Sequence, residues 1–514
     1  MTMPVSFERI PANIRVPLFY AEVSNREASY LQTLQPALLI GPMLPAGAAT
    51  PLEPVLVRDA GDAFGLFGAG SILADMVAAY RRNDTYGTIW AIPHVDATAA
   101  TAARLVMIID GIATAPGTIG VYVAGDRYRV TVANADTALI VANKLAAAIT
   151  ADPFALVTAV AIQDPDTLTA GRVTLTSKNK GAVTNDIRVV LNYRGLAGGE
   201  STPAGLDIEM GDSSLDAPGA GLADLSAAIA AMADDEYDFI SMPYTDSAAL
   251  DALAEALDDV TGRWAWNRQI YGHAFCARMG TYSQLQAFGV ARNDPHVSVL
   301  GFAVSPTVSW RRAAALCAQA ATSLRIDPAR PLQTLPLVGA LAPRRGDRFG
   351  MPQRNTLLYS GIATEMESGG AVAIERCVTT YQRNVWNQPD PSYLDVQTLA
   401  TLTYIIRFLR IRILQKFPRH KLANDGTPFG LGQAIVTPRI IRAELIAAYS
   451  ELIEQGIAEN MEAFKQFLVV ERDPNDPNRV NVLLPPDLVN QLRIFAMLVE
   501  FRLRYAASAT AAAA

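Results

Sequence analysis

A glycine-rich segment is the first place where residue types and spacing could support chemistry. The segment GLFGAGS, residues 65–71, lies between a predicted strand and a predicted helix, a setting in which helix N-terminal amides can bind phosphate. No Lys-Ser or Lys-Thr pair follows, as a Walker loop requires, and the third glycine of a dinucleotide-binding fingerprint is missing after Gly68 and Gly70. We therefore predict a tight turn in which Ser71 caps the next helix.

A histidine and a cysteine three residues apart, His273 and Cys276, have a spacing that could bind a metal ion. They lie in or at the end of an apolar predicted strand, and no second pair of ligands is near them, so we favour core packing. The remaining histidines are scattered, and neither a Gly-x-Ser-x-Gly nor a His-Glu-x-x-His motif is present. We predict no catalytic, metal-binding or cofactor-binding residues, and no cofactor.

An acidic cluster precedes a predicted strand. Its members are Asp234, Asp235, Glu236 and Asp238. Carboxylates this close together could hold a divalent cation or act as a paired acid and base. Because the cluster falls in a loop, we favour a solvated turn.

A basic region lies on and after a predicted helix near the C-terminal third. Its members are Arg407, Arg410, Arg412, Lys416, Arg419, His420 and Lys421. Nucleic acid is one candidate partner, but the aromatic residues among these charges have the helical spacing of a core face rather than of a stacking platform. Contact with an acidic protein surface is the favoured interpretation.

Composition sets the class of protein. The chain has 514 residues, which predicts two to four domains. Half of the residues are apolar and 18% are charged, so a packed protein is expected, and the net charge of −7 gives no general attraction to nucleic acid. Three widely spaced cysteines do not suggest a disulfide framework. The first residues lack the pattern of a secretion signal, so we expect a chain that is made and kept in the cytoplasm, without membrane insertion.

The elements that would position these residues follow an α/β order. Strands are predicted at 36–43, 54–58 and 88–93 around a helix at 71–82, and alternating helices and strands resume from 222 to 323. Between them, residues 97–205 show β-branched alternation, with a hairpin at 121–132. We interpret this stretch as an inserted β-rich module, with residues 195–221 as the linker that returns to the core. The parts before and after the insert are expected to share one sheet.

The C-terminal third is predicted to be helical before it returns to strands. Helices are expected at 394–414 and 438–467, the second with Thr437 as N-cap and Pro438 in its first turn, and extended surface crossings precede them at 328–343 and near Pro352. Residues 467–471 and 480–484 then form a predicted hairpin around the turn-rich DPNDPN.

Both ends of the chain carry apolar runs that lack an obvious partner. Residues 492–505 alternate with apolar side chains on both faces, as does the run at 16–23. A strand that is apolar on both faces needs cover, yet these runs lie at chain ends, where strands fray unless something pairs with them. The two runs therefore indicate pairing with neighbouring copies.

Several stretches together resemble the tail sheath proteins of contractile-tailed phages, especially the Mu-like group. They are residues 6–25 (SFERIPANIRVPLFYAEVSN), 361–382 (GIATEMESGGAVAIERCVTTYQ), 389–410 (PDPSYLDVQTLATLTYIIRFLR) and 476–505 (DPNRVNVLLPPDLVNQLRIFAMLVEFRLRY). The insert, with VYVAGDRYRVTV and TSKNKGAVTNDI, resembles the peripheral insertions of that family. The segments are specific as a set, although none is decisive alone.

The resemblance implies a structural protein that polymerises helically around a tail tube and contracts to drive the tube through the host envelope. Arms of one subunit would add strands to a hairpin of another. The implied donor residues are Val16, Leu18, Phe19, Tyr20, Val23, Ile494, Phe495, Met497, Val499, Phe501 and Leu503. The implied receiving hairpin contains Phe467, Val469, Val470, Val480, Val482 and Leu484. Basic residues that would face the tube are Arg407, Arg410, Lys416, Arg419 and Lys421. Implied partners are further copies, the tail tube protein, and the baseplate and tail terminator proteins, in the virion tail and, during assembly, the host cytoplasm.

The predicted fold is thus a multidomain α/β (α+β) chain, with a mixed-sheet core, an inserted β-rich domain and a helical C-terminal domain that ends in a hairpin and strand arms. The predicted divisions are an N-terminal arm (1–30), a core (31–96 with 206–385), an outer insert (97–205), an inner C-terminal domain (386–490) and a C-terminal arm (491–514). Two alternatives remain: an α/β enzyme with an inserted lid domain, and another virion assembly protein.

Overall fold

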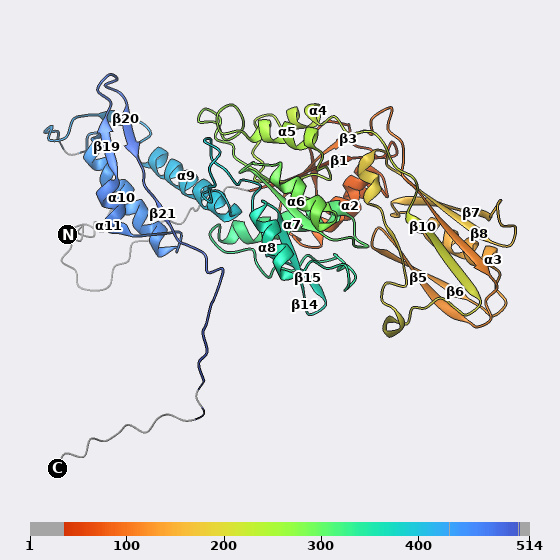
Figure 1. Ribbon diagram of the computed structural model, residues 1–514. Coiled ribbons are helices and arrows are strands. Elements are labelled where there is room, and N and C mark those ends of the chain that lie inside the picture. Colours follow the sequence, from red (N-terminus) through yellow and green to blue (C-terminus); the bar gives the residue numbers. More distant parts are fainter. Residues whose placement is uncertain (1–34, 431, 502, 504–514) are drawn as a thin grey trace, which may run out of the picture.

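The computed structural model describes residues 35–430, 432–501 and 503. Figure 1 shows a central α/β region, a β-rich region at one end and a smaller, mostly helical region at the other end. The chain passes from the central region into the β-rich region, returns, and then enters the C-terminal region through one long helix. This mixed α/β architecture agrees with the predicted fold class.

The central region is built on an eight-stranded sheet with the order β15-β14-β13-β12-β11-β1-β3-β2. The strands are β1 (Ala37–Pro42), β2 (Val55–Val57), β3 (Ile89–His94), β11 (Phe239–Ser241), β12 (His273–Met279), β13 (Val297–Phe302), β14 (Ala363–Ser368) and β15 (Ala371–Arg376). β1 lies between β3 and β11 and is parallel to both. The prediction that the parts flanking the insert share one sheet is therefore confirmed. β1 is apolar and buried along its whole length, as an interior parallel strand requires.

Helices cover this sheet. They are α1 (Ala60–Phe67), α2 (Ile72–Arg81), α4 (Ser226–Ala230), α5 (Ser247–Leu257), α6 (Tyr282–Val290), α7 (Ser309–Ile326) and α8 (Met351–Tyr359).

The prediction of a glycine-rich turn over residues 65–71 was partly wrong, because Gly65 to Phe67 form the end of α1 and only Gly68 to Gly70 turn the chain. Ser71 caps α2 as predicted, since its hydroxyl accepts a hydrogen bond from the amide of Ala74 at 3.2 Å. The segment near Pro352 was predicted to be extended but forms α8.

The β-rich region contains two antiparallel sheets, ordered β10-β4-β8-β7 and β6-β5-β9. Its elements are β4 (Arg104–Gly111), β5 (Gly117–Val123), β6 (Asp126–Val132), α3 (Ala138–Thr150), β7 (Val157–Gln163), β8 (Gly171–Ser177), β9 (Val189–Leu191) and β10 (Leu206–Ala217). The hairpin predicted at 121–132 is confirmed: Ala124 and Gly125 have positive φ angles, as a two-residue hairpin turn requires. The linker predicted at 195–221 is wrong in part, because β10 pairs with β4 across most of its length.

A buried arginine joins the β-rich region to the central helices. Arg311, in α7, forms ion pairs with Asp75 of α2 at 2.8 Å and with Asp126, at the β5–β6 turn, at 2.6 Å. The indole of Trp310 also donates to Asp75, at 2.7 Å. Burial opposes the charge on Arg311, but the two carboxylates outweigh burial and raise its pKa. Arg311 therefore links α2 to the β5–β6 turn, and its removal would leave the buried Asp75 carboxylate without a cation.

The C-terminal region has a small core of its own. Its elements are α9 (Val396–Lys416), β16 (Lys421–Leu422), β17 (Ile435–Val436), α10 (Pro438–Glu454), β18 (Ala458–Glu459), α11 (Met461–Phe467), β19 (Val469–Arg472), β20 (Val480–Leu483) and β21 (Asp487–Leu488). Thr437 caps α10 with Pro438 in its first turn, as predicted. The single helix predicted over 438–467 is instead two helices, because the chain turns at Gly456, whose φ is +72°. No helix in the described ranges is long and apolar enough to cross a membrane.

Candidate functional site

The histidine and cysteine that could have bound a metal ion are core residues. His273 donates to or accepts from the Ser298 hydroxyl at 2.9 Å, and both His273 and Cys276 are buried in β12. Burial lowers the pKa of His273 well below its usual value and raises the pKa of the Cys276 thiol to about 12. Among the described residues, no group of three or more His, Cys, Asp or Glu side chains is arranged to hold a metal ion.

The acidic cluster and the basic region, predicted separately, meet in the structure. Arg407 of α9 forms ion pairs with Asp238, at the start of β11, and with Glu236 at 3.3 Å. Arg407 and Asp238 are both buried, and burial raises the pKa of Asp238 although Arg407 opposes that shift. The solvated turn predicted for the acidic cluster is thus wrong for Asp238. The pair fixes α9 against the central sheet and removes Arg407 from the set of surface cations.

The other members of the basic region lie on or after α9. Arg412 pairs with Glu444 and Glu451 of α10, and Lys416 pairs with Glu444 at 2.7 Å. These contacts fasten α9 to α10. The side chains of Arg410, Lys416, Arg419 and Lys421 are exposed to solvent. An exposed basic surface on this region is therefore present without Arg407.

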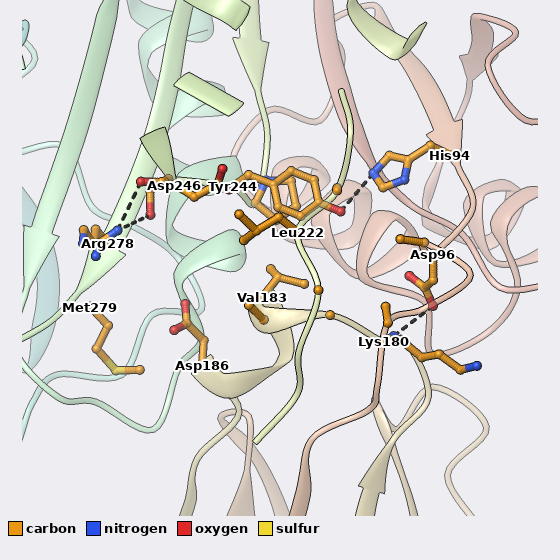
Figure 2. A pocket seen from close by; sticks show the side chains of 18 residues that line it. His94, Asp96, Lys180, Val183, Asp186, Leu222, Tyr244, Asp246, Arg278 and Met279 are labelled. Carbon is orange, nitrogen blue, oxygen red and sulfur yellow. Dashed lines mark hydrogen bonds between the residues drawn. The ribbon is translucent and has the colours of Figure 1, made fainter. Parts of the chain in front are cut away.

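One polar cavity of the central region has the location of a ligand site in an open α/β sheet. It has a volume of about 260 Å³ and lies at the carboxyl ends of β3, β11 and β12, beside the point where strand order reverses at β1. Loops of the β-rich region close its other side, and Figure 2 shows the side chains that converge there. This is the site at which an enzyme with an inserted lid would bind its substrate.

The polar side chains of this cavity have partners within the protein. The Tyr244 hydroxyl is 2.9 Å from His94 Nε2, and Asp96 accepts from the amide of Lys180 at 2.9 Å. Arg278 donates to Thr245, Asp186 accepts from Ser309, and Asp246 caps α5. Burial lowers the pKa of His94 and raises the pKa of Asp96. The contacts of Asp96 with Lys180 and of Asp186 with Ser309 join the two regions, and the other contacts lie within the central region.

The hairpin predicted near the C-terminus is present. β19 and β20 pair antiparallel, from Val469 opposite Leu483 to Arg472 opposite Val480. Two predicted members lie outside the strands: Phe467 ends α11 and Leu484 follows β20. Within the described part of the chain this sheet has only two strands, and Val469, Val482 and Leu483 are exposed. A two-stranded hairpin whose edge strands have unpaired backbone groups can accept further strands.

The C-terminal apolar run lies away from the body of the subunit. Figure 1 shows it leaving the C-terminal region and running away from β19 and β20. The exposed apolar side chains are those of Leu492, Ile494, Phe495, Met497, Leu498, Val499, Phe501 and Leu503, at 67–95% of full exposure. No strand is formed by residues 489–501. The predicted N-terminal donors Val16, Leu18, Phe19, Tyr20 and Val23 lie outside the described residues.

A contact that sequence analysis missed holds the base of this run. Arg493 donates to Asp395 at 2.9 Å, and Arg376 of β15 donates to the same carboxylate at 2.8 Å. Asp395 and Arg493 are separated by 98 residues, so no local pattern links them. The available signal in the sequence was that Arg493 interrupts the otherwise apolar residues 492–499.

Comparison with known proteins shows the family of this chain. The family model for the phage tail sheath protein central domain matches residues 219–380, and the model for the phage tail sheath C-terminal domain matches residues 388–502. The chain is 41% identical over 502 residues to the Mu-like prophage FluMu tail sheath protein of Haemophilus influenzae, which covers 97% of this chain and all of that protein.

Two solved structures are similar at lower levels. The sheath tail protein of Desulfitobacterium hafniense has a TM-score of 0.47 and 14% identity, covering 93% of this chain and 97% of that one. A sheath tail protein of Listeria innocua has a TM-score of 0.46 and 13% identity, covering 88% and 92%. Because both TM-scores are below 0.5, the family assignment depends on the sequence matches. The sequence resemblance is confirmed, and the chain belongs to the Mu-like phage tail sheath family, as a structural protein of the phage tail and not an enzyme.

Proposed function

We propose that this subunit polymerises helically around a tail tube and contracts to drive the tube through the host envelope, with neighbouring subunits linked by β-strand addition. The observation that carries the proposal is the apolar run at 494–503, which protrudes from the subunit without cover. Phe501 and Leu503 are 79% and 95% exposed. Such a run is costly in water, and its backbone groups are available for pairing.

The hairpin β19–β20 is the proposed receptor. An added strand would cover Val482 and Leu483 and would extend a sheet that is marginal with two strands. The run at 16–23 is proposed as a second donor because its alternation matches that of the C-terminal run. Donor and receptor are different surfaces, so the contact between copies is head-to-tail and generates a helix wherever the rotation does not close a ring.

We propose that the same strand linkage between subunits permits contraction. The arms hold subunits together while the globular bodies change their packing, so a strained extended lattice can relax to a shorter one without ATP. We propose that residues 386–490 lie inward, with Arg410, Lys416, Arg419 and Lys421 towards the tube, and that residues 97–205 lie outward. Residues 31–96 with 206–385 form the core between them, and 1–30 and 491–514 are the arms. The partners are the tail tube, baseplate and tail terminator proteins, and assembly takes place in the host cytoplasm.

Truncation of the arm tests this proposal. A chain that ends at Arg493 is expected to fold but not to form helical polymers, because it keeps the contacts of the body and loses the donor strand. The matched control is a chain that ends at Tyr505, which lacks only the alanine-rich residues 506–514. Polymers are measured by negative-stain microscopy and sedimentation velocity. Normal helical sheaths from the chain that ends at Arg493 would refute strand addition by this arm.

A further inference from the structure

We propose that Arg493 is a positioning residue that fixes the exit point and direction of the C-terminal arm by binding Asp395 at the base of α9. The inference rests on the proposed function, since it explains how a donor arm is presented to its receptor. It goes beyond that function by assigning a role to residues that are neither donor nor receptor.

The arm is held at two places before it leaves the subunit. The first is in the C-terminal region, where β21 pairs with β18 and the amide of Asp487 donates to the Tyr449 hydroxyl at 3.0 Å. The amide of Val489 also donates to the carbonyl of Ile457 at 3.2 Å. From this point the chain runs back towards the start of α9.

The second place is Arg493. Its guanidinium donates to Asp395 at 2.9 Å and to the Gln397 side chain at 3.1 Å. Arg493 is mostly buried, and burial lowers its pKa although Asp395 opposes that shift. Its neighbours along the chain, Leu492 and Ile494, are 72% and 80% exposed. A single buried charge between two exposed apolar residues is typical of an anchor rather than of a core position.

Asp395 is suited to orient the anchor because it is itself fixed. Arg376 binds the same carboxylate through two nitrogens, at 3.1 and 2.8 Å, and Asp395 forms a β-bridge with Val378. Two arginines on one carboxylate define both the position and the plane of the contact. The anchor therefore joins the arm to the seam between the central sheet and α9, where β15 and α9 meet.

The physical consequence is a shorter free arm. Without Arg493 the last contact before the arm would be that of Val489, so the four residues 490–493 would also have to be ordered when a neighbour captures the strand. With Arg493 in place, residues 494–505 can extend about 40 Å from a fixed point. Fixing the base lowers the ordering cost of capture and raises the effective concentration of the arm at the neighbouring hairpin.

Two measurements on Arg493→Gln test the inference. The first is made on the unassembled subunit, with spin labels at Val499→Cys and Ala248→Cys. The three native cysteines are fully buried, so the labels are selective. The distance distribution between the labels is expected to broaden in Arg493→Gln relative to the natural arginine, and Arg493→Lys is expected to restore it in part. The second is the threshold concentration for polymerisation, which is expected to rise about tenfold, the change expected for loss of one charge-assisted contact.

The controls separate this inference from the proposed function. Arg104→Gln removes an exposed ion pair with Asp216 in the β-rich region and is expected to change neither measurement. In an Asp395→Asn background the further effect of Arg493→Gln is expected to be smaller than in the natural chain, because only the contacts of Arg493 with the neutral side chains of Gln397 and Gln333 remain. If truncation at Arg493 abolishes polymers but Arg493→Gln alters neither the label distances nor the threshold, the anchor is refuted while strand addition stands. If the truncated chain polymerises normally, both are refuted.

Discussion

A negative charge placed on the donor strand gives a quantitative test of strand addition. Phe501 is 79% exposed in the subunit, so Phe501→Asp removes almost no intramolecular packing. The free energy of unfolding of the subunit is expected to change by about 0.5 kcal/mol or less. In a polymer the same side chain is expected to be covered by the hairpin of a neighbour.

The magnitude follows from that change of environment. Burial of a phenylalanine side chain contributes about 1.5–3 kcal/mol, and burial of an unpaired carboxylate adds a further cost of at least about 1–3 kcal/mol. The sum is about 3–6 kcal/mol per contact, which corresponds to a loss of association of more than about 100-fold. Since each copy makes this contact, polymerisation should cease at concentrations that assemble the natural chain.

The assay compares Phe501→Asp with Glu500→Asp. The second variant places the same side chain one residue earlier, on the opposite face, where the natural sequence already has a carboxylate. Sedimentation velocity and negative-stain microscopy are expected to show polymers for Glu500→Asp and single subunits for Phe501→Asp, with equal circular dichroism. Long polymers from Phe501→Asp at the natural threshold would refute the burial of this face in a neighbouring subunit.

Two further predictions concern the buried arginines that join the regions. Arg407→Gln should lower the free energy of unfolding by about 3–5 kcal/mol at neutral pH, because Asp238 is left buried without its cation, whereas the exposed Arg410→Gln should have little effect in urea titrations. Burial raises the folded-state pKa of Asp238, so protonation of Asp238 stabilises the fold at acid pH, and this contribution is lost as pH rises through the folded pKa. The loss of unfolding free energy in Arg407→Gln should therefore become smaller as pH falls. A loss that becomes larger at acid pH would contradict this assignment. Arg311→Met should speed hydrogen exchange in the β5–β6 hairpin more than in β7–β8, since Asp126 loses its partner; equal exchange in both hairpins would contradict the anchoring role.

Local signals predicted much of the fold. Alternation of apolar residues located the 121–132 and 469–483 hairpins, and hydroxyl caps located the starts of α2 and α10 at Ser71 and Thr437. These features depend on residues within a few positions of each other, so the sequence contains them explicitly. The predicted elements were wrong where local signals opposed the tertiary contacts. At β10, glycine and proline residues suggested a linker, but pairing with β4 makes the segment a strand.

The sequence by itself determined the family, the order of the main elements and the presence of an apolar run at 492–505. Only the tertiary structure decided which charges meet: Arg407 with Asp238 across 169 residues, and Arg493 with Asp395 across 98. The physical reason is that an ion pair depends on the distance between its charges in space, and on their burial when distant segments pack together. Neither the distance nor the burial can be calculated from the positions of the two residues along the chain.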